Sequence, residues 1–321
     1  MRAGLSRRIS PDALRRPNET RLLLVGLCGG AVPLDGGPAP RELFLAYSNA
    51  VCAFDVQTGR LDACDVYTPP NGERVYDVAY CDESNSLFIA TYKYHKSLWE
   101  RLRSFRQREH NEGAGVSVRS LARTDGQWSE CHRMKLAQEE YNRICLRICL
   151  CVLRDGTLLC SQWGTDGIHV CRANSDRSLQ HSARVALPVT HEGFDAYLAS
   201  NERWLAAALS DSSLALFRVD TEPAALVQLS RVILDGARHA LFCGKSLLVG
   251  VATNNDVREA VSFTTTDGRL QRDSQLIPRD DRLDIYNWCF VDGTYQGEET
   301  LFAWDFKSKE LLLFNEIKEI K

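Results

Sequence analysis

The sequence lacks the short motifs that identify most enzymes and metalloproteins. It contains no Cys-x-x-Cys pair, and its seven histidines show no metal-ligand spacing, so that His169, inside an apolar segment, is expected to be a packed residue. It has no Gly-x-Ser-x-Gly elbow, and neither Gly29-Gly30 nor Gly36-Gly37 is followed by the Gly-Lys-Ser/Thr of a phosphate-binding loop. These absences favour a protein that is not an enzyme and that has no metal, no cofactor and no small-molecule ligand.

An excess of charge of one sign is also missing. The chain contains 39 Lys and Arg residues and 42 Asp and Glu residues, which gives a net charge of -3. A general attraction to nucleic acid or to an acidic membrane is therefore not expected, although a local basic patch can still provide one. Because the sequence contains no apolar run of sufficient length, we predict no membrane span.

Cysteine, in contrast, is abundant, since the chain contains twelve. Most of them lie in apolar, strand-like runs, where cysteine acts as a small hydrophobic residue. These are Cys52, Cys145, Cys149, Cys151, Cys160, Cys171, Cys243 and Cys289. Cys149 and Cys151 stand two residues apart, so on one strand their side chains face the same way. We interpret the set as reduced thiols and expect an intracellular protein, in the cytoplasm or the nucleus.

A pattern of short strands begins at Arg41 to Tyr67 and returns along the chain. This stretch contains three apolar segments separated by tight turns at Ser48-Asn49 and Thr58-Gly59. The turns that we place before each fourth strand occur at Gly59, Gly126, Ser175, Thr221, Gly268 and Ser308. They are 67, 49, 46, 47 and 40 residues apart, and removing an insertion brings the first spacing to about 47. This period predicts an all-β protein, a β-propeller of four-stranded blades, with six blades, or seven if the termini or a partner contribute strands.

The chain divides into a short tail and one propeller domain. The first sixteen residues contain five arginines and one aspartate, and we expect residues 1–20 to form a flexible basic tail, although the composition also resembles a mitochondrial presequence. Residues 21–321 are predicted to form the propeller, with a basic insertion at about 93–114 between the second and third strands of the second blade. The sixth blade lacks a convincing fourth strand, so we expect an N-terminal segment to close the ring.

Dipeptides that end several predicted strands indicate a family of repeat proteins. Trp304-Asp305 occurs once, Phe54-Asp55 looks like an altered copy, and Val219-Asp220 looks like a more distant one. In these dipeptides and in its period the chain resembles the tryptophan–aspartate (WD) repeat proteins over nearly its whole length after residue 20. The Gly-His dipeptide of that family is absent, which leaves the subfamily open. The resemblance implies a propeller architecture without implying one function.

The insertion is the most distinctive local feature. Its basic residues outnumber its acidic ones, and Leu98, Leu102 and Phe105 follow a spacing that is compatible with a short amphipathic helix. The residues that we expect to bind a partner are Lys93, Lys96, Trp99, Arg101, Arg103, Arg106 and Arg108. Three interpretations stay open: a solvated loop, a surface for an acidic protein partner, and a surface for nucleic acid or lipid.

A second resemblance concerns the start of the fourth blade. Thr190 to Tyr197 is similar to the His-x-Phe-Glu-Ala-Trp sequence of diphthine methylesterase propellers, and Val75 to Tyr80 is similar to the way those proteins begin. The resemblance implies ester hydrolysis, with His191 as the residue to test, although a structural role for His191 is preferred. The match needs a one-residue gap, and Leu209 to Ser212 replaces the expected Gly-Asp-Asp, which puts the activity in doubt.

Together these observations predict a non-catalytic propeller that serves as a scaffold or adaptor. It would be a subunit of an intracellular multiprotein complex and would bind one or more proteins through loops of its rim and faces. The alternatives are a hydrolase of the diphthine methylesterase type and an RNA-binding module that uses the insertion. Trp99, Trp128, Trp163 and Tyr295 would be further partner anchors if exposed, but we expect Trp128 and Trp163 to pack within the blades.

Overall fold

The computed structural model contains only strands and turns in the residues that it describes. Those residues are 2–9, 24–31, 41–55, 60–81, 84–93, 115–136, 148–153, 155–162, 167–174, 176–187, 196–200, 204–209, 212–221, 224–243, 246–253, 256–277, 285–295, 298–305, 308 and 310–318. Within them there is no helix, and accordingly no helical segment with the length and hydropathy that a bilayer crossing requires. The prediction of an all-β protein is confirmed.

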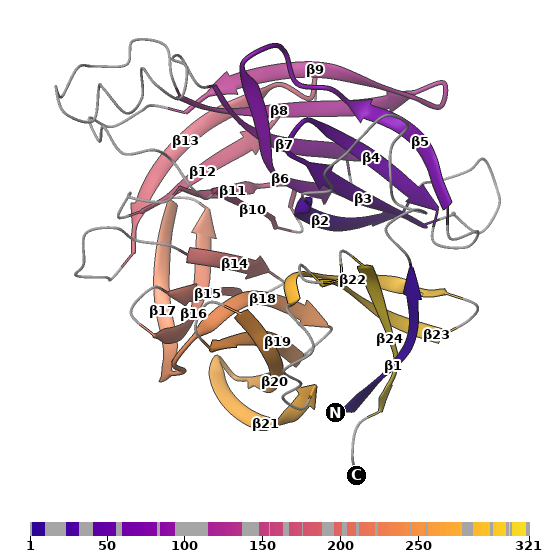
Figure 1. The fold of residues 1–321 in the computed structure, drawn as a ribbon. Helices are drawn as coiled ribbons and strands as arrows, with labels where there is room; N and C mark the ends of the chain where they lie inside the picture. Colours follow the sequence, from indigo (N-terminus) through magenta and orange to yellow (C-terminus); the bar gives the residue numbers. More distant parts are fainter. Residues whose placement is uncertain are drawn as a thin grey trace, which may run out of the picture.

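Six antiparallel sheets of four strands form blades around a ring (Figure 1). Blade 1 contains β2 (Leu24–Ala31), β3 (Arg41–Tyr47), β4 (Ala50–Asp55) and β5 (Arg60–Tyr67). Blade 2 contains β6 (Glu73–Cys81), β7 (Ser86–Lys93), β8 (Gly115–Thr124) and β9 (Gln127–Lys135). Blade 3 contains β10 (Ile148–Val152), β11 (Leu158–Gln162), β12 (Gly167–Ala173) and β13 (Leu179–Ala186).

The remaining three blades follow in chain order. Blade 4 contains β14 (Ala196–Ser200), β15 (Leu205–Leu209), β16 (Ser213–Thr221) and β17 (Ala224–Ile233). Blade 5 contains β18 (Ala237–Cys243), β19 (Ser246–Thr253), β20 (Asp256–Thr266) and β21 (Arg269–Ile277). Blade 6 contains β22 (Ile285–Tyr295), β23 (Glu298–Asp305), β24 (Glu310–Lys318) and β1 (Arg2–Ile9). The first strand of each blade lies against the first strands of both neighbouring blades and forms the inner ring. The predicted six-blade propeller is confirmed.

Strand β1 closes the ring, because it pairs with β24 as the fourth strand of blade 6. The expected closure by an N-terminal segment is confirmed, whereas Arg2–Ile9 does not belong to the flexible tail expected for residues 1–20. The closure also corrects the register of the last blade. Ser308 precedes the third strand of its blade, and Trp304-Asp305 ends the second. Phe54-Asp55, by contrast, ends a third strand, so these two dipeptides do not occupy equivalent positions.

Local turn chemistry sets two of the outer hairpins. Asp125 and Gly126 both have positive φ, at 53° and 79°, and so do Asp267 and Gly268, at 51° and 75°. Two consecutive residues with positive φ form a type I′ turn, whose twist matches that of paired strands, and Asp-Gly accepts this conformation readily. A Cβ at position 268 would lie 3.1 Å from Cδ1 of Leu229 in blade 4, so that turn also packs against its neighbouring blade.

The hydrophobic core consists of layers between neighbouring blades. Phe44 and Val51 of blade 1 pack with Val75 and Leu87 of blade 2, and similar clusters fill the next three junctions and the junction between blades 6 and 1. Because layers cover both faces of a blade, a middle strand can be apolar throughout, as in Leu205–Leu209, which is entirely buried.

Cysteines contribute to these layers as small hydrophobic residues, as predicted. The buried cysteines among the described side chains are Cys52, Cys81, Cys151, Cys160 and Cys171. Every cysteine whose side chain the structure describes is a free thiol. Cys149 and Cys151 both face the layer between blades 3 and 4, which confirms that they point the same way.

Candidate functional site

Lys93 is the one predicted partner-binding residue that lies within the described part of the chain. It ends β7, is half-buried, and pairs in register with Glu73 of β6 and Gly115 of β8. The other predicted residues, which lie outside the described residues, are Lys96, Trp99, Arg101, Arg103, Arg106 and Arg108. The structure therefore describes the base of the insertion, where β7 ends and β8 begins.

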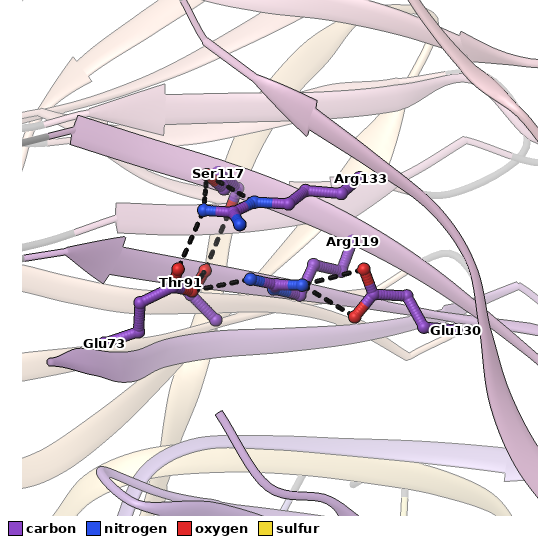
Figure 2. Close-up of polar contacts among 6 residues, drawn as sticks. All are labelled: Glu73, Thr91, Ser117, Arg119, Glu130 and Arg133. Atoms are coloured by element: carbon purple, nitrogen blue, oxygen red, sulfur yellow. Dashed lines mark hydrogen bonds and ion pairs between the residues drawn. The ribbon is translucent and has the colours of Figure 1, made fainter. Parts of the chain in front are cut away.

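A network of charged and polar side chains connects all four strands of blade 2 beside this base (Figure 2). Arg119 of β8 and Glu73 of β6 have side chains that are only 3% exposed, and Arg119 Nη2 donates to Glu73 Oε2 at 2.7 Å. Arg119 Nη1 donates to both carboxylate oxygens of Glu130 in β9, at 2.7 and 2.6 Å. Arg133 of β9 donates to Glu73 Oε1 at 2.7 Å, and the hydroxyl of Thr91 in β7 donates to Glu73 Oε2 at 3.1 Å.

We call this set, completed by Ser117, the blade 2 charge network. Burial by itself would raise the pKa of Glu73, but the hydrogen bond and charge of Arg119, with the charge of Arg133, hold that pKa below its ordinary value of 4.5. Burial acts to lower the pKa of Arg119, yet hydrogen bonds from its guanidinium to Glu73 and Glu130 keep that pKa above its ordinary value. Glu73 and Arg119 are therefore both charged at neutral pH, and the hydrogen bonds of the network connect the four strands of blade 2.

The network also contacts blade 1. Arg119 lies with Cζ 5.5 Å from the ring centroid of Tyr67 in β5, a cation–π arrangement. Burial raises the pKa of Tyr67 far above its ordinary range, so its hydroxyl stays protonated. Within the described residues, the buried Nε of Arg119 and the buried hydroxyl of Tyr67 have no hydrogen-bond partner. The junction between blades 1 and 2 thus contains polar atoms as well as the apolar layer.

Further basic residues share the face of blade 2 that carries this network. Glu73 pairs with Lys93, and Ser117 pairs with Lys135, so these positions lie on one face of the sheet. Lys135 is exposed, and the side chain of Arg133 is 34% exposed. The base of the insertion therefore presents positive charge to solvent, next to a segment that is itself basic.

A second set of polar contacts joins the inner strands of blades 2, 3 and 4. The Asp77 carboxylate accepts the Leu150 N–H of blade 3 at 2.7 Å and the Val78 N–H of its own strand at 2.9 Å. Cys149 Sγ of blade 3 accepts the Leu198 N–H of blade 4 at 3.3 Å. Burial raises the pKa of Asp77 to about 7 and raises the pKa of Cys149 well above its ordinary range. An un-ionised thiol is a poor nucleophile. The contacts of Asp77 and Cys149 instead connect blade 2 to blade 3 and blade 3 to blade 4.

Two histidines form a pair in blade 3, where Nδ1 of His169 lies 3.1 Å from Nε2 of His181. His169 is 3% exposed, which confirms the prediction of a packed residue. Burial, and secondarily the charge of His181, lowers the pKa of His169 to about 4, so it is neutral at physiological pH. In the described part of the chain, no group of three or more His, Cys, Asp or Glu residues is arranged to hold a metal ion.

The four aromatic residues named as possible partner anchors differ in whether the structure describes them and in what they contact. Trp128 packs edge-on against Phe44 and Tyr80, with ring centroids 5.5 and 6.5 Å away, so its predicted packing role is confirmed. Tyr295 ends β22. Trp99 and Trp163 lie outside the described residues, as does His191 of the esterase-like sequence.

The blade 2 charge network is not among the sites predicted from the sequence. Its members are spread over residues 73–133, and only strand pairing brings them together. The local signal is Arg119, a charged residue in the middle of the buried stretch of β8 from Val116 to Ala122. A buried charge at such a position is costly without counter-charges, so it predicts acidic neighbours, although it does not identify them.

No family model and no curated protein matches this sequence. Among solved structures, the β-propeller domain of Cps50 (Swd1) from Myceliophteria thermophila is similar, with a TM-score of 0.53 and 12% identity over 90% of this chain and 82% of that chain. A protein from Lactobacillus plantarum is similar with a TM-score of 0.54 and 16% identity, over 90% of this chain and 82% of that one. At these identities the likeness shows the β-propeller fold alone, and the resemblance to WD-repeat proteins stays a prediction.

Proposed function

We propose that this protein is a non-catalytic β-propeller scaffold, a subunit of an intracellular multiprotein complex that binds a protein partner through the basic insertion between β7 and β8. The observation that carries the proposal is the blade 2 charge network at the base of the insertion. A buried ion-pair network adds less to stability than apolar packing of equal volume, but it fixes geometry. Here it fixes the strand ends on both sides of the insertion.

The charge around that base supports an acidic partner surface. Lys93, Arg133 and Lys135 lie on one face of blade 2, and the insertion adds further basic residues. Complementary charge on a partner would speed association and set its orientation. A rigid ring with a basic segment at one blade therefore suits a scaffold that positions a partner.

The polar groups of the inner strands also support a non-catalytic role. Asp77 is engaged by two backbone N–H groups, and the Cys149 thiol is un-ionised at neutral pH. A general base or a nucleophile needs a free lone pair directed at a substrate. Asp77 instead accepts from the backbone of its own strand and of β10, and Cys149 accepts from the backbone of β14.

The test compares tagged intact protein with two variants, one lacking residues 94–114 and one with Arg101, Arg103, Arg106 and Arg108 changed to alanine. Proteins captured from the source cell are identified and then recombined with purified intact protein. We expect a stoichiometric complex that both variants fail to form. A matched control changes two exposed arginines of β21, Arg269 and Arg272, to alanine and should bind normally.

Nucleic acid is the competing ligand in this experiment. Capture that disappears after ribonuclease treatment, with affinity that falls steeply as salt rises, would assign the insertion to RNA. A complex that survives ribonuclease and contains protein in fixed stoichiometry supports the scaffold. A complex that forms equally well with both insertion variants would contradict the proposed binding site.

A further inference from the structure

The turn between β12 and β13 of blade 3 docks on the neighbouring blade, where β13 contacts β9, the fourth strand of blade 2. The Ser120 hydroxyl of β8 donates to the Arg177 carbonyl of the turn at 2.8 Å. The Leu179 N–H, at the beginning of β13, donates to Nδ1 of His132 in β9 at 3.0 Å. Hydrogen bonds to two strands of blade 2 therefore fix this end of blade 3.

The bond to Leu179 requires a neutral imidazole. Nδ1 of His132 is the acceptor, so it carries no proton, and the ring proton of the neutral side chain lies on Nε2. A protonated imidazole donates from both nitrogens, and its Nδ1–H would face the Leu179 N–H as a second donor. The uptake of one proton by His132 therefore removes this hydrogen bond. The Ser120 hydroxyl does not titrate and keeps its bond to the turn.

Asp176 supplies a negative charge beside the same ring. Its carboxylate accepts from the hydroxyl and the N–H of Ser178, at 2.6 and 2.9 Å. These hydrogen bonds, with a smaller contribution from the charge of His132, lower the pKa of Asp176. Asp176 is therefore ionised throughout the range around pH 6.5 in which histidine side chains ordinarily titrate. A protonated imidazole at position 132 thus has an anionic partner on the turn.

The charged side chains of β9 do not compete for His132. Arg133 and Glu130 bond within the blade 2 charge network, which lies on the face of the sheet opposite to His132. Cys131, the residue before His132, is an exposed free thiol. The counter-charge for a protonated His132 therefore comes from blade 3.

The other titratable or charged residues of blade 3 at this junction are Cys171, His169, His181, Arg177 and Arg184. Burial raises the pKa of Cys171 to about 12. Burial, and secondarily the charge of His181, lowers the pKa of His169 to about 4. Cys171 and His169 therefore stay neutral where histidines ordinarily titrate. His181, whose Nε2 lies 3.1 Å from Nδ1 of His169, is the residue that a control must separate from His132.

We propose that protonation of His132 releases the beginning of β13 from blade 2, so that the contact between blades 2 and 3 is a local pH-sensitive switch. Neutral His132 binds the Leu179 N–H, and protonated His132 turns to the Asp176 carboxylate. The Leu179 side chain is 4% exposed and belongs to the apolar layer between the two blades. Its release opens the outer end of that layer, while the bond from Ser120 holds the turn in place. The switch is independent of the proposed scaffold function, because it uses no residue of the insertion.

The experiment is amide hydrogen exchange followed by NMR, which gives the protection factor of the Leu179 amide at about pH 7.5 and about pH 5. We expect that protection factor to fall by roughly fivefold or more on acidification, the factor that corresponds to losing one hydrogen bond. In His132→Asn the side-chain oxygen can replace Nδ1 as an acceptor and does not titrate, so the protection should not change with pH. His181→Gln is the matched control and should keep the decrease. The amide of Leu248, in the core of blade 5, should stay equally protected in each protein.

The nitrogen-15 chemical shifts of the His132 ring give a second measurement, on the unmodified protein. They should show a proton on Nε2 alone at the higher pH and on both nitrogens at the lower. A ring that carries its proton on Nδ1 at the higher pH overturns the proposal, because it cannot accept from Leu179. So does protection at Leu179 that is equal at the two pH values, or that falls equally in His132→Asn.

Two further outcomes would also contradict a local switch at His132. A decrease that disappears in His181→Gln would assign the pH dependence to His181. A parallel decrease at Leu248 would mean that acid weakens the whole ring. Deleting residues 94–114 should leave the decrease at Leu179 unchanged, so this test and the test of the scaffold function can fail separately.

Discussion

Replacing Arg119 by methionine should destabilise the protein by about 3 kcal/mol, the lower end of the range for removing one partner of a buried ion pair. The substitution leaves the Glu73 carboxylate, 3% exposed, with Arg133 as its remaining charged donor. It leaves Glu130 at 35% exposure, where water can hydrate it. The loss is therefore concentrated at Glu73. Urea unfolding at pH 7, followed by circular dichroism, measures it.

Two companion variants separate the lost charge from lost packing. Glu73→Gln combined with Arg119→Met removes both buried charges and should recover most of the stability. The double variant leaves no uncompensated buried charge, so its desolvation penalty is absent. Glu130→Gln removes the exposed end of the network and should cost less than about 1 kcal/mol. If Arg119→Met unfolds at the same urea concentration as the unmodified protein, or if the double variant is no better, the network is not what holds blade 2.

The pH dependence gives a further check with a definite sign. The folded-state pKa of Glu73 lies below its ordinary value of 4.5, so Glu73 contributes stability above that value and loses it as pH falls through the folded pKa. In Arg119→Met the main cause of the lowered pKa is gone. The stability difference between the two proteins should therefore shrink as pH falls below 4.5 and through the folded-state pKa of Glu73, because Glu73 then becomes protonated in both.

Three other perturbations test different parts of the fold. The pKa of Asp77 is raised to about 7, so Asp77 contributes stability at acid pH that is lost as pH rises to 7. The stability of Asp77→Asn relative to the unmodified protein should therefore improve from pH 4 to pH 7 in urea titrations. A difference that does not change with pH would contradict this. Gly268→Ala should cost more than Gly126→Ala, since both have positive φ but only the former Cβ meets Leu229, and equal melting temperatures would refute the contact. Deleting residues 1–9 uncovers β24 and should lower the melting temperature and cause aggregation in light scattering, whereas a tail would be dispensable.

Propeller architecture was predictable because it depends on local signals. Asp-Gly turns, alternation within short strands and a period in the forties all act over a few residues or a single blade. The same locality explains the error at the last blade. The likeness of Trp304-Asp305 to Phe54-Asp55 predicts equivalent positions, but blade 6 begins at β22, so Trp304-Asp305 ends a second strand. Only the pairing of β1 with β24, some 300 residues apart, decides that register.

The charge network was less predictable for the same physical reason. Arg119 signals that a buried cation needs acidic partners, but Glu73 is 46 residues away and Glu130 is 11 residues away in sequence, on other strands. Several carboxylates along blade 2 satisfy the signal equally well until register is known. The Asp77 contact with Leu150 is harder still, since it crosses between blades and its acceptor binds a backbone N–H that every residue except proline offers.

The position of the network separates stability from binding in a way that experiments can use. All six of its residues lie outside residues 94–114, so deleting the insertion should leave the free energy of unfolding nearly unchanged, because a shorter loop between β7 and β8 alters closure entropy only slightly. Removing Arg119 should instead lower the free energy of unfolding directly. It should weaken partner binding only indirectly, through the loss of the fixed register between the ends of β7 and β8. A variant without the insertion that is as stable as the intact protein but cannot bind would place recognition in the insertion and rigidity in its base. Loss of both properties together would mean that the insertion packs on the blade and belongs to the fold.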